Sequence, residues 1–163
     1  MKSQNPWWKG KHGEWYVVAQ MGLFFMVFFG PLYWLGWPTW PSPASKLAAV
    51  VGSVILLSGS LLFLSGILRL GANLSALPYP KSESMLVETG PYRIVRHPMY
   101  SGAIWIAVGW ALVIHSWLAV GTAVVIFFFF DLKSRREEAW LKEKFSGYAA
   151  YQQRVHKLVP FIY

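Results

Sequence analysis

A histidine, two arginines and two tyrosines stand together where a polar loop leads into a long apolar stretch. They are Tyr92, Arg93, Arg96, His97 and Tyr100. Titratable groups at membrane depth are costly unless they face a protein interior or a wet cavity, so they usually persist for a function. Pro98 suits the first position of a helix, which places His97 at the helix mouth. Unpaired backbone N–H groups there favour an anion such as a carboxylate.

Tyr100 falls within the first turn of that helix and could close over a flat or apolar ligand. A plainer interpretation is equally open from these residues. In it, Arg93 and Arg96 only hold lipid phosphates, and His97 only caps the helix.

Two adjacent acids, Glu137 and Glu138, form a second candidate cluster within the charged run 131–145. Lys133 precedes Glu137 by four residues and Asp131 precedes Arg135 by four, so solvated ion pairs on a helix face explain much of this pattern. They do not explain why both acids fall at the expected depth of His97. A pocket there would offer carboxylates to a cationic or hydroxyl-bearing ligand and a helix mouth to an anionic one. A zwitterionic cofactor fits both.

The elements that position these clusters are predicted to be membrane helices. The chain of 163 residues is 55% hydrophobic and only 13% charged, whereas a soluble domain carries about twice that share of charge. The uncharged stretches 15–37 and 47–68 each have the ~20 residues needed to cross a hydrocarbon core. The stretch 98–130 is too long for one crossing, and His115 and Ser116 offer a break. We therefore expect about four transmembrane helices, the last two forming a tight hairpin.

The distribution of lysine and arginine predicts the orientation. These residues accumulate on the cytoplasmic side of short loops, which places the basic leader 1–14 and the loop 69–97 inside and the turn 37–46 outside. Lys46 alone breaks the bias. Both termini are predicted to be cytoplasmic. The chain divides into the leader, two helices at 15–70, and a half at 71–163 that carries both clusters.

Small residues and prolines predict how the helices and the inner loop pack. Gly52, Gly59 and Gly66 recur every seven residues, which lets a neighbouring helix come close, whether from this chain or another copy. The loop 71–91 contains three prolines and should be irregular chain over the inner face, as a lid or pocket wall.

Other classes of function are disfavoured. The absence of cysteine excludes disulfides and thiolate chemistry. The histidines lack a metal-binding spacing, so no metal site is expected. The net charge of +8 is explained by topology and by attraction to anionic lipid, so no nucleic-acid partner is expected.

Two separated motifs carry a family resemblance. The run G-P-Y-x-x-x-R-H-P-x-Y-x-G is followed, after the apolar hairpin, by R-E-E-x-x-L-x-x-x-F and a Y-x-x-Y tail ending in a proline. This half of the chain, roughly 84–160, resembles the isoprenylcysteine carboxyl methyltransferase family, to which phospholipid methyltransferases are related. The tail spacing departs from the family pattern, which leaves the roles of Tyr148 and Tyr151 undefined.

The resemblance implies an S-adenosyl-L-methionine cofactor held on the cytoplasmic side by the last hairpin and the loops around it. The matching cofactor contacts are Met85, Leu86, Val87, Tyr92, His97, Pro98, Tyr100, Glu137 and Glu138. A basic residue before the acids resembles the residue that orients the substrate, and the alignment leaves both Lys133 and Arg135 open. His97 is a further catalytic candidate for acceptors that must lose a proton.

The resulting hypothesis is an all-α integral membrane methyltransferase acting on a lipidic or small apolar acceptor, by transfer to a carboxylate, an amine or a thiol. The acceptor and the oligomeric state stay open. The alternative is a non-catalytic membrane module that binds anionic lipid or a partner protein through its basic inner face.

Overall fold

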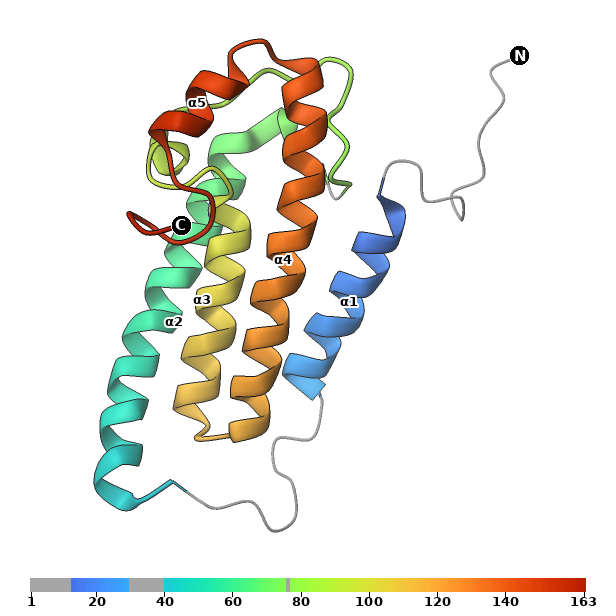
Figure 1. Cartoon of the computed structure of the whole chain (residues 1–163). Coiled ribbons are helices and arrows are strands. Elements are labelled where there is room, and N and C mark those ends of the chain that lie inside the picture. The colour runs from blue at the N-terminus through green and yellow to red at the C-terminus, as the bar shows by residue number, and fades with distance from the viewer. Residues whose placement is uncertain (1–12, 30–39, 76) are drawn as a thin grey trace.

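The structure, a computed structural model, describes residues 13–29, 40–75 and 77–163. Within these residues four long helices lie side by side: α1 (Glu14–Phe29), α2 (Ser42–Leu70), α3 (Pro98–Val113) and α4 (Trp117–Lys144) (Figure 1). The short helix α5 (Tyr148–Arg154) and two single 3₁₀ turns, η2 (Gly71–Asn73) and η3 (Gly90–Arg93), lie near one end of the bundle. The all-helical prediction is confirmed for this part of the chain. Residues 1–12 of the predicted leader and residues 30–37 of the first predicted crossing lie outside the described residues.

Among the residues that the structure describes, two helices are long and apolar enough to cross a membrane. One is the segment Pro43–Asn73, which covers α2 from its second residue together with η2, and the other is α4. Each measures more than roughly 40 Å at about 1.5 Å of rise per residue, which exceeds a hydrocarbon core of about 30 Å. Helices α1 and α3 are apolar but shorter.

Helix α2 packs against α3 through reciprocal glycine contacts. A Cβ built on Gly59 would lie 2.9 Å from the carbonyl oxygen of Gly102, and one built on Gly102 would lie 2.7 Å from the carbonyl oxygen of Gly59. Gly52 and Gly109 repeat this relation two turns away, at 2.8 and 2.7 Å. Only hydrogen side chains let the two backbones approach so closely. The glycine face predicted from sequence is therefore confirmed, and its partner is a helix of the same chain.

The predicted break in the third apolar stretch is confirmed. Helix α3 ends at Val113, His115 adopts a φ of 54°, and Ser116 caps α4 by accepting a hydrogen bond from the Ala119 N–H at 3.2 Å. A serine N-cap satisfies one of the orphan N–H groups that start a helix. The His115 ring also contacts the Ser45 carbonyl oxygen at 2.7 Å, which ties the hairpin turn to the start of α2.

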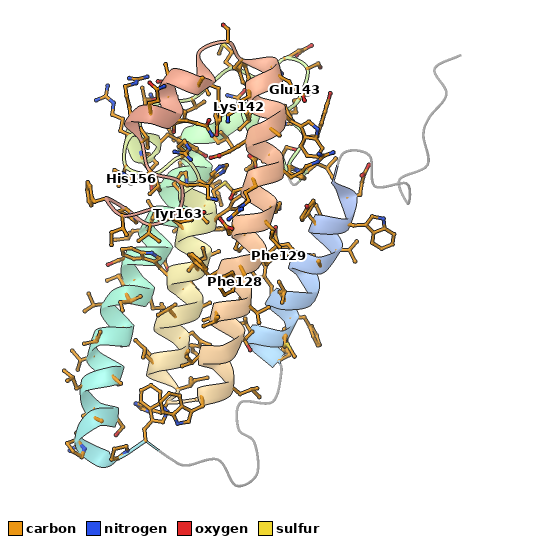
Figure 2. The ribbon with its side chains drawn as sticks, viewed as in Figure 1. Phe128, Phe129, Lys142, Glu143, His156 and Tyr163 are labelled. Carbon is orange, nitrogen blue, oxygen red and sulfur yellow. The ribbon has the colours of Figure 1, made fainter. Side chains whose placement is uncertain are left out.

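Apolar side chains fill the bundle and also cover its outside. The core comprises Ala103, Ile104, Ala107, Ala123, Ile126, Phe130 and Leu158. On the outer face of α2, Leu57, Leu61 and Leu68 are exposed by 61% to 81%. Such a wide exposed apolar surface marks a contact with lipid or protein. Figure 2 shows the change along α4, from the apolar region of Phe128 and Phe129 to the polar end at Lys142 and Glu143.

The chain after α5 is tied to the start of α3. The segment 155–157 runs beside residues 95–97, with backbone hydrogen bonds from Arg96 N to His156 O at 2.8 Å and from His97 N to Lys157 O at 3.2 Å. Lys157 pairs with Asp131 of α4, and the fully buried Leu158 joins the core. The C-terminal segment therefore holds the entry of α3 in place.

Candidate functional site

The two clusters predicted from sequence meet at one end of the bundle. His97 Nε2 lies 3.1 Å from Glu138 Oε1, and the Tyr100 hydroxyl donates to Glu137 Oε2 at 2.6 Å. Pro98 begins α3 as predicted, which fixes His97 as its N-cap residue and puts Tyr100 in the first turn. The His97 and Tyr100 rings stack 5.3 Å apart, with 6° between their planes. The shared depth expected for the histidine and the acids is thus observed.

Arg96 engages the same oxygen of Glu138 as His97. Its Nε lies 2.8 Å from Glu138 Oε1, and its Nη1 donates to the backbone carbonyls of Gln152 and Val155. The Gln152 amide donates to Glu138 Oε2 at 2.7 Å. Both ionic side chains are about 90% buried, where a charge persists only with good partners. Glu138 is therefore the centre of a network that joins α3, α4 and α5.

A cavity of about 830 Å³, counting its open mouth, lies beside this network. One wall is the loop after α2, whose residues 77–80 and 84–87 line the cavity. The opposite wall comes from Leu141 and Phe145 at the end of α4 and from two tyrosines of α5. The loop 71–91 is thus a pocket wall, one of the two roles predicted for it.

The loop is held against α4 by Lys144. Its ammonium donates to the Ser82 carbonyl at 2.9 Å and to the Ser84 hydroxyl at 2.8 Å. Tyr79 packs edge-on against Trp140 of α4, with ring centroids 5.4 Å apart. These contacts hold the cavity-lining loop against α4.

Most of the predicted cofactor contacts line this one cavity. They are Met85, Leu86, Val87, Tyr92, His97, Pro98, Tyr100 and Glu137. Glu138 does not line it, because its oxygens are taken by Arg96, His97 and Gln152. The two acids therefore differ: Glu137 faces the cavity, and Glu138 supports the wall from behind.

The two basic residues predicted to orient a substrate lie elsewhere. Lys133 is 2% exposed and donates to Gln20 Oε1 of α1 at 2.6 Å, with its ammonium 5.0 Å from the centre of the Tyr100 ring. Arg135 points away from the cavity, pairs with Asp131 at 2.8 Å, and lines an open groove with Lys157. Of the two basic residues, Lys133 is the one that lies beside Tyr100, a residue of the cavity wall.

Three tyrosines at the cavity are buried: Tyr92, Tyr148 and Tyr151. One hydrogen bond joins two of them. The Tyr151 hydroxyl donates to the Tyr92 carbonyl at 2.6 Å. The hydroxyl of Tyr148, which is 1% exposed, has no hydrogen-bond partner among the described residues. Burial raises the pKa of Tyr92, Tyr148 and Tyr151 above the ordinary tyrosine range. All three therefore stay protonated, and Tyr148 keeps an unused donor that suits a ligand with acceptor oxygens.

Two residues that matter here were not placed in the site by sequence reasoning. The sequence suggests for Arg96 only a contact with lipid phosphate, yet its side chain turns inward to Glu138 and also lines the cavity. For Tyr148 the sequence offers only its place in the tail motif, with no defined role. The available signal for Arg96 was its position next to His97 at the depth of the acids, where a buried carboxylate needs a cation.

Proteins of similar sequence are methyltransferases. The sequence profile described as phospholipid methyltransferase matches residues 47–147. The chain is 34% identical over 125 residues to a protein-S-isoprenylcysteine O-methyltransferase of Saccharomyces cerevisiae, covering 74% of this chain and 52% of that protein. It is also 34% identical over 115 residues to protein-S-isoprenylcysteine O-methyltransferase B of Arabidopsis thaliana, covering 68% of this chain and 58% of that protein.

A solved structure shares the fold. It is that of the eukaryotic intramembrane Ras methyltransferase, an isoprenylcysteine carboxyl methyltransferase, with a TM-score of 0.64 and 26% identity. The match covers 93% of this chain and 54% of that chain. The chain thus spans about half the length of the relatives it matches. Together with the two apolar helices long enough to cross a membrane, these matches show that the protein is an integral membrane protein. It belongs to the phospholipid methyltransferase family, among the members related to isoprenylcysteine carboxyl methyltransferases.

Proposed function

We propose that this protein is a membrane methyltransferase that uses S-adenosyl-L-methionine and methylates a lipidic or small apolar acceptor. One observation carries the proposal: a cavity lies where the two family motifs meet, with His97, Tyr100 and Glu137 in its wall. The relatives named above supply the reaction class.

The cavity has the charges that a zwitterionic nucleoside cofactor needs. Glu137 offers a carboxylate to an ammonium group, and Arg96 offers a guanidinium to a carboxylate, both within one cavity. The unused Tyr148 donor adds a group for an acceptor oxygen. The side chains of Leu77, Leu86 and Phe145 supply apolar surface for a flat base. Residues present in the structure therefore fit this cofactor.

The bound cofactor would supply an activated methyl group, and transfer is an in-line displacement whose main demand is positioning. The network around Glu138 supplies that positioning by locking His97 and the α3 entry in one geometry. A carboxylate acceptor needs no proton removal. For an amine or thiol acceptor, His97 would accept the proton through Nδ1, because Nε2 is engaged by Glu138.

An apolar acceptor would reach the site from the lipid, beside α1 and α4. Lys133 is buried at that contact, bonded to Gln20 of α1 and set over Tyr100. In this proposal its ammonium meets an acidic acceptor head group that enters between the two helices. We accordingly favour Lys133 over Arg135 as the residue that orients the acceptor.

The proposed membrane arrangement has α1 to α4 as four crossings, with the cavity and both chain ends on the cytoplasmic side. The antiparallel order of the described helices supports it, because the start of α1, the end of α2, the start of α3 and the end of α4 share one end of the bundle (Figure 1). That end also carries the lysines and arginines that the positive-inside rule assigns to the cytoplasm.

The test is cofactor binding and methyl transfer by the purified full chain in lipid nanodiscs. We expect calorimetric binding of S-adenosylhomocysteine that weakens in His97→Ala and Glu137→Ala and persists in Arg93→Ala, an exposed residue outside the cavity. Methyl-labelled cofactor, offered with a farnesylated cysteine analogue or with phosphatidylethanolamine, then identifies the acceptor class. Absence of binding to the wild-type chain would refute the proposal and favour the non-catalytic alternative.

A further inference from the structure

A basic groove lies between α4 and the chain that ends α5 and follows it. Its basic and acidic lining residues are Arg96, Arg135, Glu138, Arg154, His156 and Lys157. Arg96 pairs with Glu138, so the groove owes its charge to the other basic residues. Among the described residues, only Arg96 lines both this groove and the cavity of the candidate site. The basic groove is therefore a second surface feature, which the proposed function does not use.

The positive charges of the basic groove exceed the acids that pair with them. Asp131 of α4 pairs with both Arg135 and Lys157, so one carboxylate serves two cations. Arg154 pairs with Glu88 of the loop before η3. That contact is open to solvent, where an ion pair contributes little. The groove therefore keeps an uncompensated positive charge, which attracts an anion.

Two arginines of the basic groove remain accessible. The side chain of Arg135 is exposed by 64% and that of Arg154 by 65%. Arg135 directs Nε and Nη2 to the same oxygen of Asp131, and a guanidinium has more N–H donors than one carboxylate oxygen accepts. A guanidinium also matches the oxygens of a phosphate group in a bidentate arrangement. The two residues therefore suit a phosphate or a similar oxyanion.

The basic groove lies at the boundary between the polar and apolar parts of the bundle. Figure 2 shows His156 and Tyr163, which both line it, between the polar end at Lys142 and the apolar region of Phe128. Arg135 lies roughly 27 Å along α4 from the start of that helix, at about 1.5 Å of rise per residue. A hydrocarbon core is about 30 Å thick. In this membrane protein the groove is therefore expected at the depth of the lipid headgroups.

Apolar side chains border the basic groove. Ile162, which lines it, is exposed by 78%, and the adjacent Phe161 is exposed by 80%. Exposed apolar residues beside basic ones are typical of segments at a membrane surface, where the apolar groups enter the acyl region and the basic groups meet headgroups. A free phosphate ion would gain nothing from Phe161 and Ile162. The combination therefore matches an amphiphile with an anionic headgroup.

We infer that the basic groove binds the phosphate of an anionic glycerophospholipid from the surrounding membrane. Arg135 and Arg154 are its charged contacts, and Phe161 and Ile162 lie against the acyl chains. The lipid is a ligand there and takes part in no reaction. The inference goes beyond the proposed function and does not depend on it, because the groove is separate from the cavity.

The first experiment measures binding to the purified full chain in detergent by native mass spectrometry. The probes are phosphatidylglycerol, phosphatidylcholine and glycerol 3-phosphate, which has the phosphate but no acyl chains. We expect phosphatidylglycerol to bind about tenfold more tightly than phosphatidylcholine, and glycerol 3-phosphate to bind far more weakly than either lipid. Equal affinity for the two lipids would overturn the anionic selectivity. Glycerol 3-phosphate bound as tightly as phosphatidylglycerol would show a site for free phosphate esters instead.

The second experiment removes two charges from the groove with Arg135→Gln and Arg154→Gln together. The matched control is Arg93→Gln with Arg136→Gln, which removes two exposed arginines outside the groove. We expect phosphatidylglycerol to bind about 10-fold to 30-fold more weakly to the groove variant and nearly unchanged to the control. Equal weakening in both double variants would show that binding follows net charge, and would overturn the site.

Photocrosslinking on the wild-type chain locates the lipid without any substitution, so it does not depend on how the variants fold. The probe is a phosphatidylglycerol with a photoreactive headgroup, incorporated into nanodiscs that hold the full chain. We expect the label on segment 152–157 and on the turn of α4 around Arg135. A label spread evenly over the exposed residues at this end of the bundle, or confined to the cavity wall, would overturn the inference.

Discussion

His97 Nε2 lies 3.1 Å from Glu138 Oε1, although 41 residues separate the two in the chain. The contact joins the mouth of α3 to the last third of α4, and the same carboxylate also holds Arg96 and Gln152. A carboxylate that fixes three side chains from two distant parts of the chain sets the geometry of the cavity wall. The relation explains why the two motifs must occur together.

Replacing Glu138 should destabilise the protein strongly. Glu138→Ala leaves Arg96 as a buried cation without its carboxylate, and breaking such a pair costs about 3–5 kcal/mol. Denaturant titration in detergent micelles measures this free energy of unfolding. The control is Glu143→Ala at an exposed position further along α4 (Figure 2), where a change of less than about 0.5 kcal/mol is expected. Equal effects of both substitutions would contradict the described network.

Adding one methyl group between α2 and α3 should also destabilise the bundle. The Cβ of Gly59→Ala would meet the Trp105 Cβ at 2.7 Å and the Gly102 carbonyl oxygen at 2.9 Å. Overpacking of this kind costs about 1–3 kcal/mol. Gly121 of α4 has no heavy atom within 4 Å of a built Cβ, so Gly121→Ala should raise stability by up to about 1 kcal/mol through helix propensity. We expect the melting temperature to fall in Gly59→Ala and to rise in Gly121→Ala. A fall in both variants would argue against the helix contact.

Releasing the C-terminal segment should expose it to exchange and proteolysis. Lys157→Met removes the buried ion pair with Asp131 and should cost about 1.5–3 kcal/mol, the worth of a hydrogen bond to a charged group. Hydrogen exchange at the Leu158 amide, next to the substitution, reports the loss directly. Lys142→Met, at an exposed lysine of α4 (Figure 2), should leave that amide as protected as in the wild-type chain. Protection that survives in Lys157→Met would show that the ion pair does not hold the segment.

Lys133 should affect the acceptor more than the cofactor. It lies outside the cavity wall but over the Tyr100 ring and against α1. Lys133→Met keeps most of the side-chain volume, so we expect unchanged S-adenosylhomocysteine affinity and a fall of about tenfold in kcat/KM for the acceptor, the equivalent of one hydrogen bond to a charged group. Steady-state kinetics with the acceptor varied measures the second quantity. A loss of cofactor affinity with kcat/KM preserved would rule out the acceptor role.

The sequence alone predicted the elements that depend on neighbouring residues. Pro98 predicted the start of α3, His115 and Ser116 predicted the hairpin turn, and the glycine repeat predicted a close helix contact. Each of these features is confirmed, because helix caps, turns and residue periodicity act over only a few residues. The depth shared by His97 and the paired acids could likewise be read from helix lengths.

Only the tertiary structure decided which side chain meets which. Glu137 and Glu138 are adjacent and chemically alike, yet the rotation of α4 turns Glu137 to the cavity and Glu138 to Arg96. The same rotation directs the Lys133 side chain toward α1 and the Arg135 side chain toward the open groove that it lines with Lys157. A difference of one or two positions on a helix changes the direction of a side chain by about 100° per residue at 3.6 residues per turn. Packing between distant segments sets that rotation, so it left no local signal in the sequence.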